Sequence, residues 1–286
     1  MCIRDRCNNI LIFSDIDGSL TCHNDYKLDK ISSFLALIIK SFHLIFSSSK
    51  TYYELKNFVN KNKIDSPFVV ENGSAIFFPK NSFKHLNFNN DFKSNDDYFF
   101  IVLGTTISEI KKIINLNDAK NFILKCQFMH QMKIEEIMSC TGLNYENSKK
   151  ARQRQYSLPF LWLGSNRQLE AFKKFVIKFN LKIIFGGKFF HLTGKSDKGQ
   201  ALLYLKNFYS SFLEKELLTV ALGDSENDVQ MLLDADYSGI IKNNHIEKIK
   251  LKKIKNTFYS NSPAPEGWKE ILLMIKPIKN QIGRNI

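Results

Sequence analysis

The chain has 286 residues, 44% of them hydrophobic, so it can bury one large core or two modest ones and is not expected to be disordered. Lys and Arg number 41 and Asp and Glu 28, a formal net charge of +13, but the lysines are spread along the whole chain; this favours a solvated basic surface, and no nucleic-acid partner is expected. Five cysteines, an odd number without a C-x-x-C pair, argue against a disulfide framework or a zinc site and favour a reducing cytoplasm.

The start of the chain holds no segment suited to a membrane. The longest apolar run there, residues 34–39, is far shorter than a membrane span, and no charged segment precedes it as in a signal peptide. We therefore expect no export signal, no membrane anchor and a cytoplasmic location. Residues 1–6 fit poorly with the strand that follows them and are interpreted as a non-native leader. The sequence leaves the oligomeric state open.

Strands and helices alternate in the first part of the chain. Apolar runs predict buried strands at residues 9–14, 43–47 and 68–71, and apolar residues at helical spacing predict helices at residues 28–40 and 52–60. Alternation of this kind is typical of parallel β-α-β units and therefore predicts a doubly wound parallel sheet.

The alternation stops at about residue 87, where a polar, Asn-rich stretch begins. The segments predicted beyond it are strands at 98–103 and 160–163, helices at 108–114 and 168–179, and a hairpin of residues 181–185 and 189–192 around Gly186 and Gly187. The earlier pattern returns after Gly194, with a helix at 198–208, a strand at 217–222 and a helix at 228–233. We therefore expect a cap domain, residues 87–193, inserted into a core formed by residues 1–86 and 194–286.

Two acids follow the first predicted strand. Asp15 and Asp17 stand two positions apart, so in extended backbone their side chains point the same way, and Gly18 allows the chain to turn tightly afterwards. With a divalent cation present, one carboxylate can attack a phosphoryl group while the other protonates the leaving alcohol. The alternative is an Asp-rich turn or a helix cap after a strand.

Two further segments could hold a phosphoryl group. The SSSKT segment, residues 47–51, follows the second strand and brings hydroxyls, backbone N–H groups and a helix N-terminus to one place, although by itself it could equally be a loop with a helix cap. Lys198 begins a predicted helix and can supply a fixed cation to the nucleophile and to the phosphoryl oxygens. A lone lysine is ordinarily solvated surface, so its role depends on the other motifs.

The last motif, GDSEND at residues 223–228, again follows a predicted buried strand. Its carboxylates are hard oxygen ligands of the kind that Mg²⁺ prefers, which makes Asp224 a candidate direct ligand. Asp228, one helical turn further on, could bind the ion or could orient water and Lys198. The alternative is that Asp224 only caps a helix.

These four motifs, in this order, resemble those of the haloacid-dehalogenase (HAD) superfamily of phosphotransferases. The resemblance implies an α/β fold, a Rossmann-like doubly wound parallel sheet with an inserted α+β cap of the C2B type, together with Mg²⁺ as cofactor and an aspartyl-phosphate intermediate. The catalytic roles that it implies are the nucleophile for Asp15, the general acid/base for Asp17, the second-motif hydroxyl for Ser48 and the third-motif lysine for Lys198. The metal residues that it implies are Asp15, Asp17 through its backbone carbonyl, Asp224 and Asp228.

A finer similarity is to the mannosyl-3-phosphoglycerate phosphatase family. It rests on SSKT at residues 48–51, ENG at 71–73, GGKFFHLTG at 186–194 and APEGW at 264–268, and the last of these has no obvious catalytic need. The residues that the resemblance assigns to substrate binding are Ser49, Lys50, Asn72, Gly73, Arg152, Arg154, Ser157 and His191. The two arginines suit a bidentate grip on a carboxylate or phosphate, but they could also be solvated residues on a helix surface.

The arginine-rich segment, residues 151–159, departs from the family's pattern at Leu158, where an acid is usual. If the missing carboxylate contacts the sugar, the preferred hexose differs from mannose. If that position only packs, the departure changes nothing.

We therefore predict a Mg²⁺-dependent phosphatase, a phosphoric monoester hydrolase whose partner is a phosphorylated glycosyl-glycerate. The predicted reaction converts 2-(α-mannosyl)-3-phosphoglycerate to mannosylglycerate, a compatible solute, and phosphate. One alternative is a broader sugar phosphatase that acts on glucosyl-3-phosphoglycerate, sucrose phosphate or hexose phosphates. An alternative of another class is a catalytically silent protein that binds phosphorylated ligands or nucleic acid.

Overall fold

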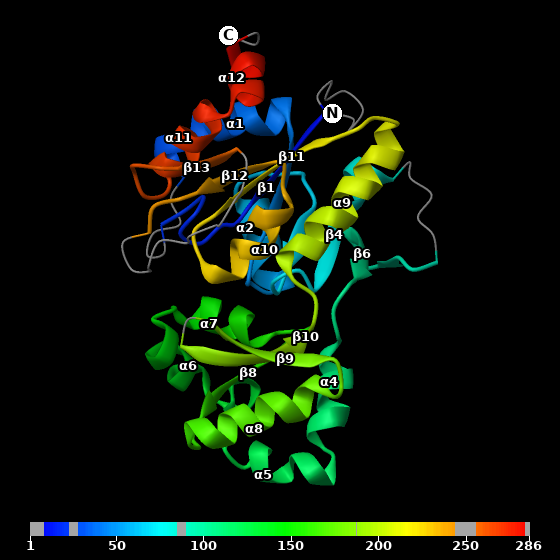
Figure 1. Cartoon of the computed structure of the whole chain (residues 1–286), viewed down its shortest axis with the longest axis vertical. Coiled ribbons are helices and arrows are strands. Elements are labelled where there is room, and N and C mark those ends of the chain that lie inside the picture. Colours follow the sequence, from blue (N-terminus) through cyan, green and yellow to red (C-terminus); the bar gives the residue numbers. More distant parts are fainter. Residues whose placement is uncertain (1–8, 23–27, 85–89, 187, 244–255, 284–286) are drawn as a thin grey trace. The chain divides into compact units, whose positions relative to one another are not determined.

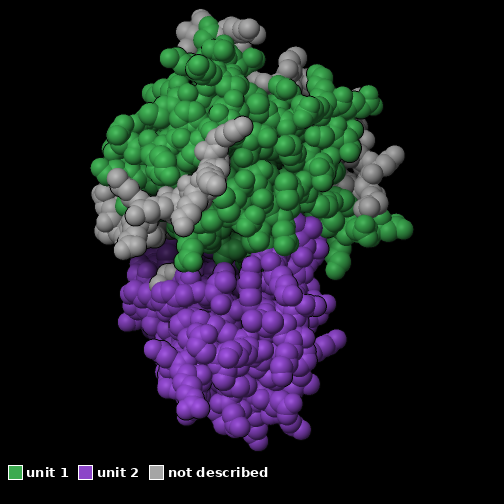
Figure 2. Space-filling model, in the orientation of Figure 1, with its two compact units in different colours: residues 1–48, 63–101, 197–286 green, residues 49–62, 102–196 purple. Residues whose placement is uncertain are grey.

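The protein is described here by a computed structural model that covers residues 9–22, 28–84, 90–186, 188–243 and 256–283. The predicted leader, Gly187 of the predicted hairpin and the start of the predicted linker lie outside these residues. The chain forms two compact units (Figure 2). Unit 1 contains residues 1–48, 63–101 and 197–286, and unit 2 contains residues 49–62 and 102–196.

Unit 1 is built on a nine-stranded sheet with the strand order β13-β12-β11-β1-β2-β3-β4-β6-β5 (Figure 1). Its strands are β1 Ile10–Ser14, β2 His43–Ser47, β3 Phe68–Val70, β4 Ala75–Pro79, β5 Lys93–Ser94, β6 Tyr98–Val102, β11 Leu218–Gly223, β12 Tyr237–Ile240 and β13 Thr257–Tyr259. The pairs from β13 to β3 are parallel, whereas β4 runs antiparallel to β3. The predicted doubly wound parallel sheet is therefore confirmed.

The helices of unit 1 include the three predicted near residues 28–40, 198–208 and 228–233, and three more that had not been predicted. They are α1 Ser32–Ser41, α3 Lys80–Phe83, α9 Lys198–Leu213, α10 Val229–Asp234, α11 Glu266–Met274 and α12 Lys276–Gly283, with short 3-10 turns at Asp29–Ile31 and Glu226–Asp228. The first predicted helix, residues 28–40, therefore starts as a 3-10 turn and becomes α-helical at Ser32. The helix predicted at 198–208 continues to Leu213, because apolar side chains such as Leu205 and Tyr209 stay buried along it.

The centre of the sheet explains where the site forms. Strands β1, β2 and β11 are buried along their length, apart from the half-buried first residue of β11, as expected for parallel strands covered on both faces. β1 pairs with β11 on one side and with β2 on the other, in registers that set Ser14 opposite Leu222 and Phe46. Because parallel strands end at the same edge of a sheet, the residues that follow β1, β2 and β11 meet at that edge.

Unit 2 is built on a four-stranded antiparallel sheet with the order β7-β8-β10-β9. The strands are β7 Cys126–Phe128, β8 Ser157–Trp162, β9 Leu181–Gly186 and β10 Phe189–Gly194. The helices are α2 Tyr52–Lys61, α4 Ile107–Ile114, α5 Lys120–Ile123, α6 Ile134–Thr141, α7 Tyr145–Arg152 and α8 Asn166–Ile177, with 3-10 turns at Asn117–Ala119 and Met129–Gln131. α8 runs along one face of this sheet (Figure 1).

Side chains alternate along the strands, so one face of this sheet is apolar and packs against α8 and the other face carries the alternate residues. Leu158, Phe160 and Leu192 belong to an apolar cluster that includes Phe172 and Val176 of α8. Residues that alternate with them, such as Ser157, Pro159 and His191, therefore lie on the opposite face. The predicted helix at 168–179 and the predicted hairpin belong to this unit, whereas α6, α7 and β7 had not been predicted.

The strand predicted at residues 160–163 begins three residues earlier, at Ser157. The predicted cap, residues 87–193, covers most of unit 2 but is not the same division, because unit 2 also contains residues 49–62 and starts later, at residue 102. A separate core and cap therefore stays a proposal. Among the described residues, no helix combines the length and the apolar character needed to cross a membrane.

Candidate active site

The first motif begins where β1 ends. Asp15 continues the ladder by one bond, because its N–H donates to the carbonyl of Leu222 at 2.9 Å. The chain then turns back on itself: the N–H of Gly18, whose φ is +85°, donates to the carbonyl of Thr21 at 2.7 Å, and the N–H of Thr21 donates to that of Ile16 at 2.8 Å. A positive φ is readily adopted by glycine, so Gly18 explains why the turn can be this tight.

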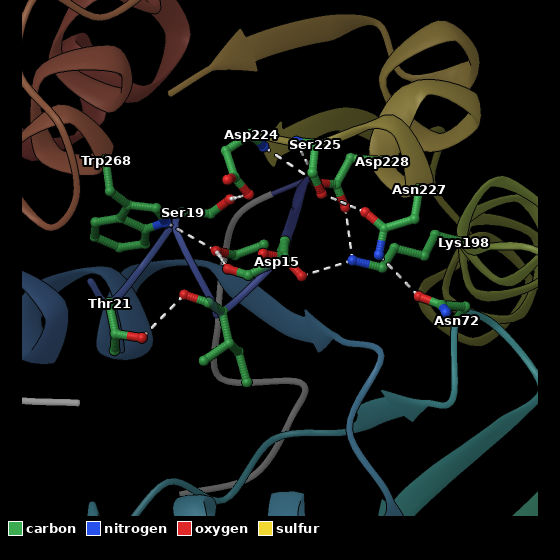
Figure 3. Close-up of polar contacts among 12 residues, drawn as sticks. Asp15, Ser19, Thr21, Asn72, Lys198, Asp224, Ser225, Asn227, Asp228 and Trp268 are labelled. Atoms are coloured by element: carbon green, nitrogen blue, oxygen red, sulfur yellow. Dashed lines mark hydrogen bonds and ion pairs between the residues drawn. The ribbon is translucent and has the colours of Figure 1, made fainter. Parts of the chain in front are cut away.

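Lys198 reaches the same point from the N-terminus of α9 (Figure 3). Its Nζ lies 2.6 Å from Oδ1 of Asp15 and 2.6 Å from Oδ1 of Asp228. The helix is fixed at this end by Asp197, whose carboxylate accepts from the N–H of Gln200 at 2.9 Å. The ammonium group of Lys198 therefore joins an acid of the first motif to an acid of the last motif.

The last motif follows β11 and folds around Asp228. Oδ2 of Asp228 accepts hydrogen bonds from the backbone N–H groups of Asp224 and Ser225, both at 3.1 Å, and from the Ser225 hydroxyl at 3.1 Å. A side chain on Gly223 would lie only 2.5 Å from Cβ of Asp228, so this turn requires glycine. Asp228 is thus held on one oxygen by its own loop and on the other by Lys198.

Three of the four predicted metal residues form one buried cluster. Carboxylate oxygens of Asp15, Asp224 and Asp228 all lie within 4.8 Å of one another. Oδ1 of Asp224 accepts from the Ser19 hydroxyl at 3.1 Å, and Oδ2 accepts from Nδ2 of Asn243 at 2.6 Å. Asp17 was predicted to contribute through its backbone carbonyl, and its side chain is not part of this cluster. Three hard oxygen donors gathered in this way are chemically suited to a magnesium ion.

Burial controls the ionisation of the cluster. It raises the pKa of Asp15 well above its ordinary value; Lys198 opposes this effect, and the nearby carboxylates of Asp228, Asp224 and Asp17 add to it. Burial alone would lower the pKa of Lys198, but its two aspartate partners outweigh burial and raise it. The lysine therefore stays charged, and repulsion among the acids gives the cluster an affinity for further positive charge.

A strained loop connects the second motif to the last one. Glu71, Asn72 and Gly73 all have positive φ, at +46°, +58° and +95°, and the N–H of Asn72 donates to the carbonyl of Ser48 at 3.0 Å. Oδ1 of Asn72 in turn accepts from Nδ2 of Asn227 at 3.0 Å (Figure 3). The predicted residues Ser48, Asn72 and Gly73 are thus brought to the loop that lies beside the last motif.

The remaining predicted substrate residues belong to unit 2. Ser49 and Lys50 are half-buried in the segment that leads to α2. Nη1 of Arg154 donates to the carbonyl of Ser49 at 3.1 Å and to the hydroxyl of Ser157 at 3.2 Å, so these three residues form one group. Arg152 is separate from that group, because its Nη1 donates to the carbonyl of Met132 at 3.2 Å.

His191 lies on the same face of the unit 2 sheet as Ser157. Burial, and secondarily the charge of Arg154, lower its pKa to about 3, although its hydrogen bond to Gly186 acts in the opposite direction. The imidazole is therefore neutral near pH 7. Nε2 lies 3.3 Å from the carbonyl of Gly186, and since a carbonyl only accepts, Nε2 carries the proton and Nδ1 is the acceptor nitrogen.

The departure at Leu158 has a structural explanation. The side chain is completely buried and belongs to the apolar cluster of unit 2, on the face of the sheet opposite Ser157. In this chain position 158 therefore packs in a core, where an unpaired carboxylate would be costly.

Sequence reasoning missed several residues that support the site. Asn243 and Ser19 hold Asp224, Asn227 holds Asn72, and Trp268 donates from Nε1 to the Ser14 hydroxyl at 2.9 Å. For Asn227 and Trp268 a signal existed, because each stands in a segment that had been singled out, and Ser19 directly follows Gly18 of the first motif. Asn243 had none, since a lone asparagine after a strand is ordinarily part of a loop.

The fold and this acidic cluster define a class of enzyme. The chain belongs to the haloacid dehalogenase-like hydrolases, whose family profile matches residues 12–261. The predicted superfamily is thereby confirmed. Solved structures agree in fold: a protein of Thermotoga maritima superposes with a TM-score of 0.62 at 16% identity, over 93% of this chain and 97% of that one.

Closer relatives narrow the class to phosphatases. A glucosyl-3-phosphoglycerate/mannosyl-3-phosphoglycerate phosphatase of Persephonella marina is 34% identical over 279 residues, 96% of this chain and 99% of the relative. A mannosyl-3-phosphoglycerate phosphatase of Pyrococcus furiosus is 32% identical over 232 residues, 81% of this chain and 90% of the relative. Like these relatives, the chain is a phosphoric monoester hydrolase, as the sequence had predicted.

Proposed function

We propose that this chain removes the phosphate of 2-(α-mannosyl)-3-phosphoglycerate and, as a second substrate, of its glucosyl analogue. The observation that carries the proposal is the pair of 2.6 Å contacts of Lys198 with Asp15 and Asp228, beside Asp224. This arrangement offers one carboxylate for attack, one fixed cation and a cluster of acids, which are the parts that phosphoryl transfer through an aspartate needs.

The proposed reaction has two steps. A carboxylate oxygen of Asp15 attacks phosphorus, the bond from phosphorus to the glycerate oxygen breaks, and Asp17 gives its proton to that leaving oxygen. Water then attacks the aspartyl-phosphate and passes a proton to Asp17, so inorganic phosphate leaves and the carboxylate of Asp15 is restored. Throughout, Lys198 balances the charge of the nucleophile and of the phosphoryl oxygens, and Ser48 donates to one of these oxygens.

We assign Mg²⁺ as the cofactor. Asp15, Asp224 and the backbone carbonyl of Asp17 would hold it, with Asp228 beside them, and these are donors that suit a hard cation. When bound, the ion supplies positive charge to the phosphoryl oxygens and relieves the repulsion among the acids. The buried, mutually repelling carboxylates support this assignment, since their ionised form needs a cation to compensate it.

Recognition of the glycosyl-glycerate is proposed for the unit 2 group of Ser49, Arg154, Ser157 and His191, with Lys50 and Arg152 as further contacts. The guanidinium of Arg154 is oriented by Ser49 and Ser157, as a carboxylate-binding arginine should be. A neutral His191 with Nδ1 as its acceptor suits a sugar hydroxyl, which can donate to it. The packing of Leu158 removes the reason to expect a hexose other than mannose at that position.

Phosphate release from synthetic mannosyl- and glucosyl-3-phosphoglycerate tests the proposal. We expect turnover of both substrates, loss of turnover after chelation with recovery on addition of Mg²⁺, and none in Asp15→Asn. Asp118→Asn, a change at an exposed acid of unit 2, is the matched control and should behave as the wild type.

Two results would count against the proposal. Equal turnover of hexose phosphates and sucrose phosphate would favour the broader sugar phosphatase, and full activity of Asp15→Asn would remove the proposed nucleophile. The cytoplasmic location also stays a proposal, and fractionation of the source cells would test it.

A further inference from the structure

We propose that Trp268 is a positioning residue for the nucleophile, acting on Asp15 through the hydroxyl of Ser14. The APEGW segment, residues 264–268, is a feature for which the proposed chemistry has no use, yet it lies against the first motif. Trp268 is the third residue of α11, and its side chain and that of Ser14 are completely buried. The inference concerns the support of Asp15 and rests on the proposed role of that residue as the nucleophile.

A directed pair of hydrogen bonds connects the indole to the motif (Figure 3). Nε1 of Trp268 donates to Oγ of Ser14 at 2.9 Å, and the Ser14 hydroxyl donates to the backbone carbonyl of Asp15 at 2.7 Å. An indole nitrogen can only donate and a carbonyl can only accept, so the single hydroxyl hydrogen must point at Asp15. The tryptophan therefore fixes the direction in which Ser14 donates.

This relay completes the fixation of the Asp15 backbone. The N–H of Asp15 is already bonded to the carbonyl of Leu222 at 2.9 Å, on the side of the sheet formed by β11. Its carbonyl belongs to the peptide bond at which the strand ends and the turn towards Asp17 starts, and this carbonyl accepts the hydrogen bond from the Ser14 hydroxyl. With both backbone groups bonded, the Cα–Cβ direction of Asp15 is set, and so is the start of the turn that carries Asp17.

The same segment contacts the first motif a second time. Sγ of Cys22, at the far end of the turn, donates to the carbonyl of Ala264 at 2.8 Å. Ser14 and Cys22 stand on either side of the motif, so the APEGW segment is tied to the chain both before and after the two catalytic acids. Two contacts at opposite ends of one loop are what a support of that loop requires.

The position of Trp268 is itself closely determined. A Cβ on Gly239 of β12 would lie 2.4 Å from Ile271 of α11, so the glycine allows this helix to approach the sheet. A Cβ on Gly267 would lie 2.2 Å from the carbonyl of Ser262, and Glu270 accepts from the N–H of Ser262 at 3.1 Å. The helix and the segment before it therefore form one rigid support for the indole.

Packing alone would also explain a buried tryptophan, so the test must separate the indole N–H from the ring. Trp268→Phe keeps an aromatic ring, which can still meet Phe34 edge-on as the indole does, but removes the donor. Ile271→Val, a change at a completely buried residue of the same helix, is the matched control for lost packing. Turnover of p-nitrophenyl phosphate is the readout, because this substrate has neither sugar nor glycerate and the result does not depend on their recognition.

For Trp268→Phe we expect kcat to fall about fivefold with KM unchanged, the rate equivalent of one neutral hydrogen bond. Ile271→Val should lower the melting temperature about as much as Trp268→Phe does and should leave kcat unchanged. In a double-mutant cycle, Trp268→Phe should have little further effect once Ser14→Ala is present, because the relay is already broken.

An unchanged kcat in Trp268→Phe, or the same fold-loss with and without Ser14→Ala, would overturn the proposal. If Ser14→Ala does not fold, the comparison of Trp268→Phe with Ile271→Val still decides, because equal kcat values would refute the relay. Activity retained by Asp15→Asn would instead refute the proposed function, so the two failures can be told apart.

Discussion

Replacement of Gly73 should displace Lys198 without changing its side chain, and so test how much activity depends on the position of this lysine. With φ at +95°, a Cβ on Gly73 would lie 2.0 Å from the carbonyl oxygen of Asp197, 2.2 Å from its carbonyl carbon and 2.9 Å from the nitrogen of Lys198. All three atoms are backbone at the start of α9, so they cannot swing aside as a flexible side chain would. We predict that Gly73→Ala shifts the start of this helix and moves the ammonium away from Asp15 and Asp228.

Two costs contribute to the expected loss of stability. A left-handed conformation costs a non-glycine residue about 1–2 kcal/mol, and overpacking of a tight contact costs about 1–3 kcal/mol, which together give about 2–5 kcal/mol. The effect on catalysis comes from the hydrogen bonds of Lys198. A bond to a charged group contributes about 1.5–3 kcal/mol, so its loss lowers kcat by about 10- to 150-fold.

Gly142→Ala is the control for the backbone cost alone. Gly142 has φ at +77°, but a Cβ there would meet no atom within 4 Å, so only the left-handed conformation is penalised. Thermal melting and phosphate release at saturating substrate should show a smaller stability loss and an unchanged kcat. The reasoning is refuted if Gly73→Ala keeps its kcat and loses no more stability than Gly142→Ala.

Three further predictions concern charge and burial. Lys198→Gln leaves two buried aspartates without their cation, so we expect the free energy of unfolding to fall by about 3–5 kcal/mol and activity to be lost. Lys206→Gln breaks a partly exposed pair with Asp236 and should cost under about 1 kcal/mol, and equal melting temperatures of the two variants would contradict this. The folded pKa of His191, about 3, lies below its unfolded value of about 6.5, so the unfolded state takes up the proton first as the pH falls and stability is lost across that window. His191→Gln should flatten this part of a melting series, and an unchanged slope would count against it. Leu158→Glu should destabilise unit 2, as circular dichroism would show, and a stable variant with a stronger mannosyl preference would disprove the packing explanation.

The central strands of unit 1 could be predicted because they are buried on both faces and therefore consist of continuous apolar runs. The run at residues 43–47 coincides with β2, and the strand predicted at 217–222 differs from β11 by one residue at each end. The polar residues that follow such runs must lie at the carboxyl edge of a parallel sheet, so Asp15 and Asp224 could be brought together from the sequence alone.

One of the helices that were missed, α7, lacks an apolar stripe. In α7, an eight-residue helix with three basic residues in its last turn, only Ser148 and Ala151 are buried, so no periodic signal exists. Its start is marked only by Asn144, whose side chain accepts from the N–H of Asn147. Strand β7 has only three residues and is defined by its pairing with β8, which no local pattern encodes.

The supporting contacts of the site could not be predicted for a different reason. The hydroxyl of Ser19 and the carboxylate of Asp224 are 205 positions apart in sequence, and Trp268 and Ser14 are 254 positions apart. Hydrophobic periodicity indicates which face of an element is buried, but not which distant side chain will donate a hydrogen bond to it. The acids could be named from their motifs, whereas their orientation depends on the tertiary structure.

The position of β1 between β2 and β11 has a consequence for synthesis on the ribosome. The growing chain produces the first strand and its nucleophile early, but the second partner exists only after residues 218–223 have been translated. Until then the backbone N–H and C=O groups on one edge of that strand are unpaired and can pair with another nascent polypeptide. All strands of the antiparallel sheet at residues 126–194 are translated before β11, so this sheet can form without it. In a polypeptide released before β11, we therefore expect that sheet to resist proteases and the remainder to be degraded.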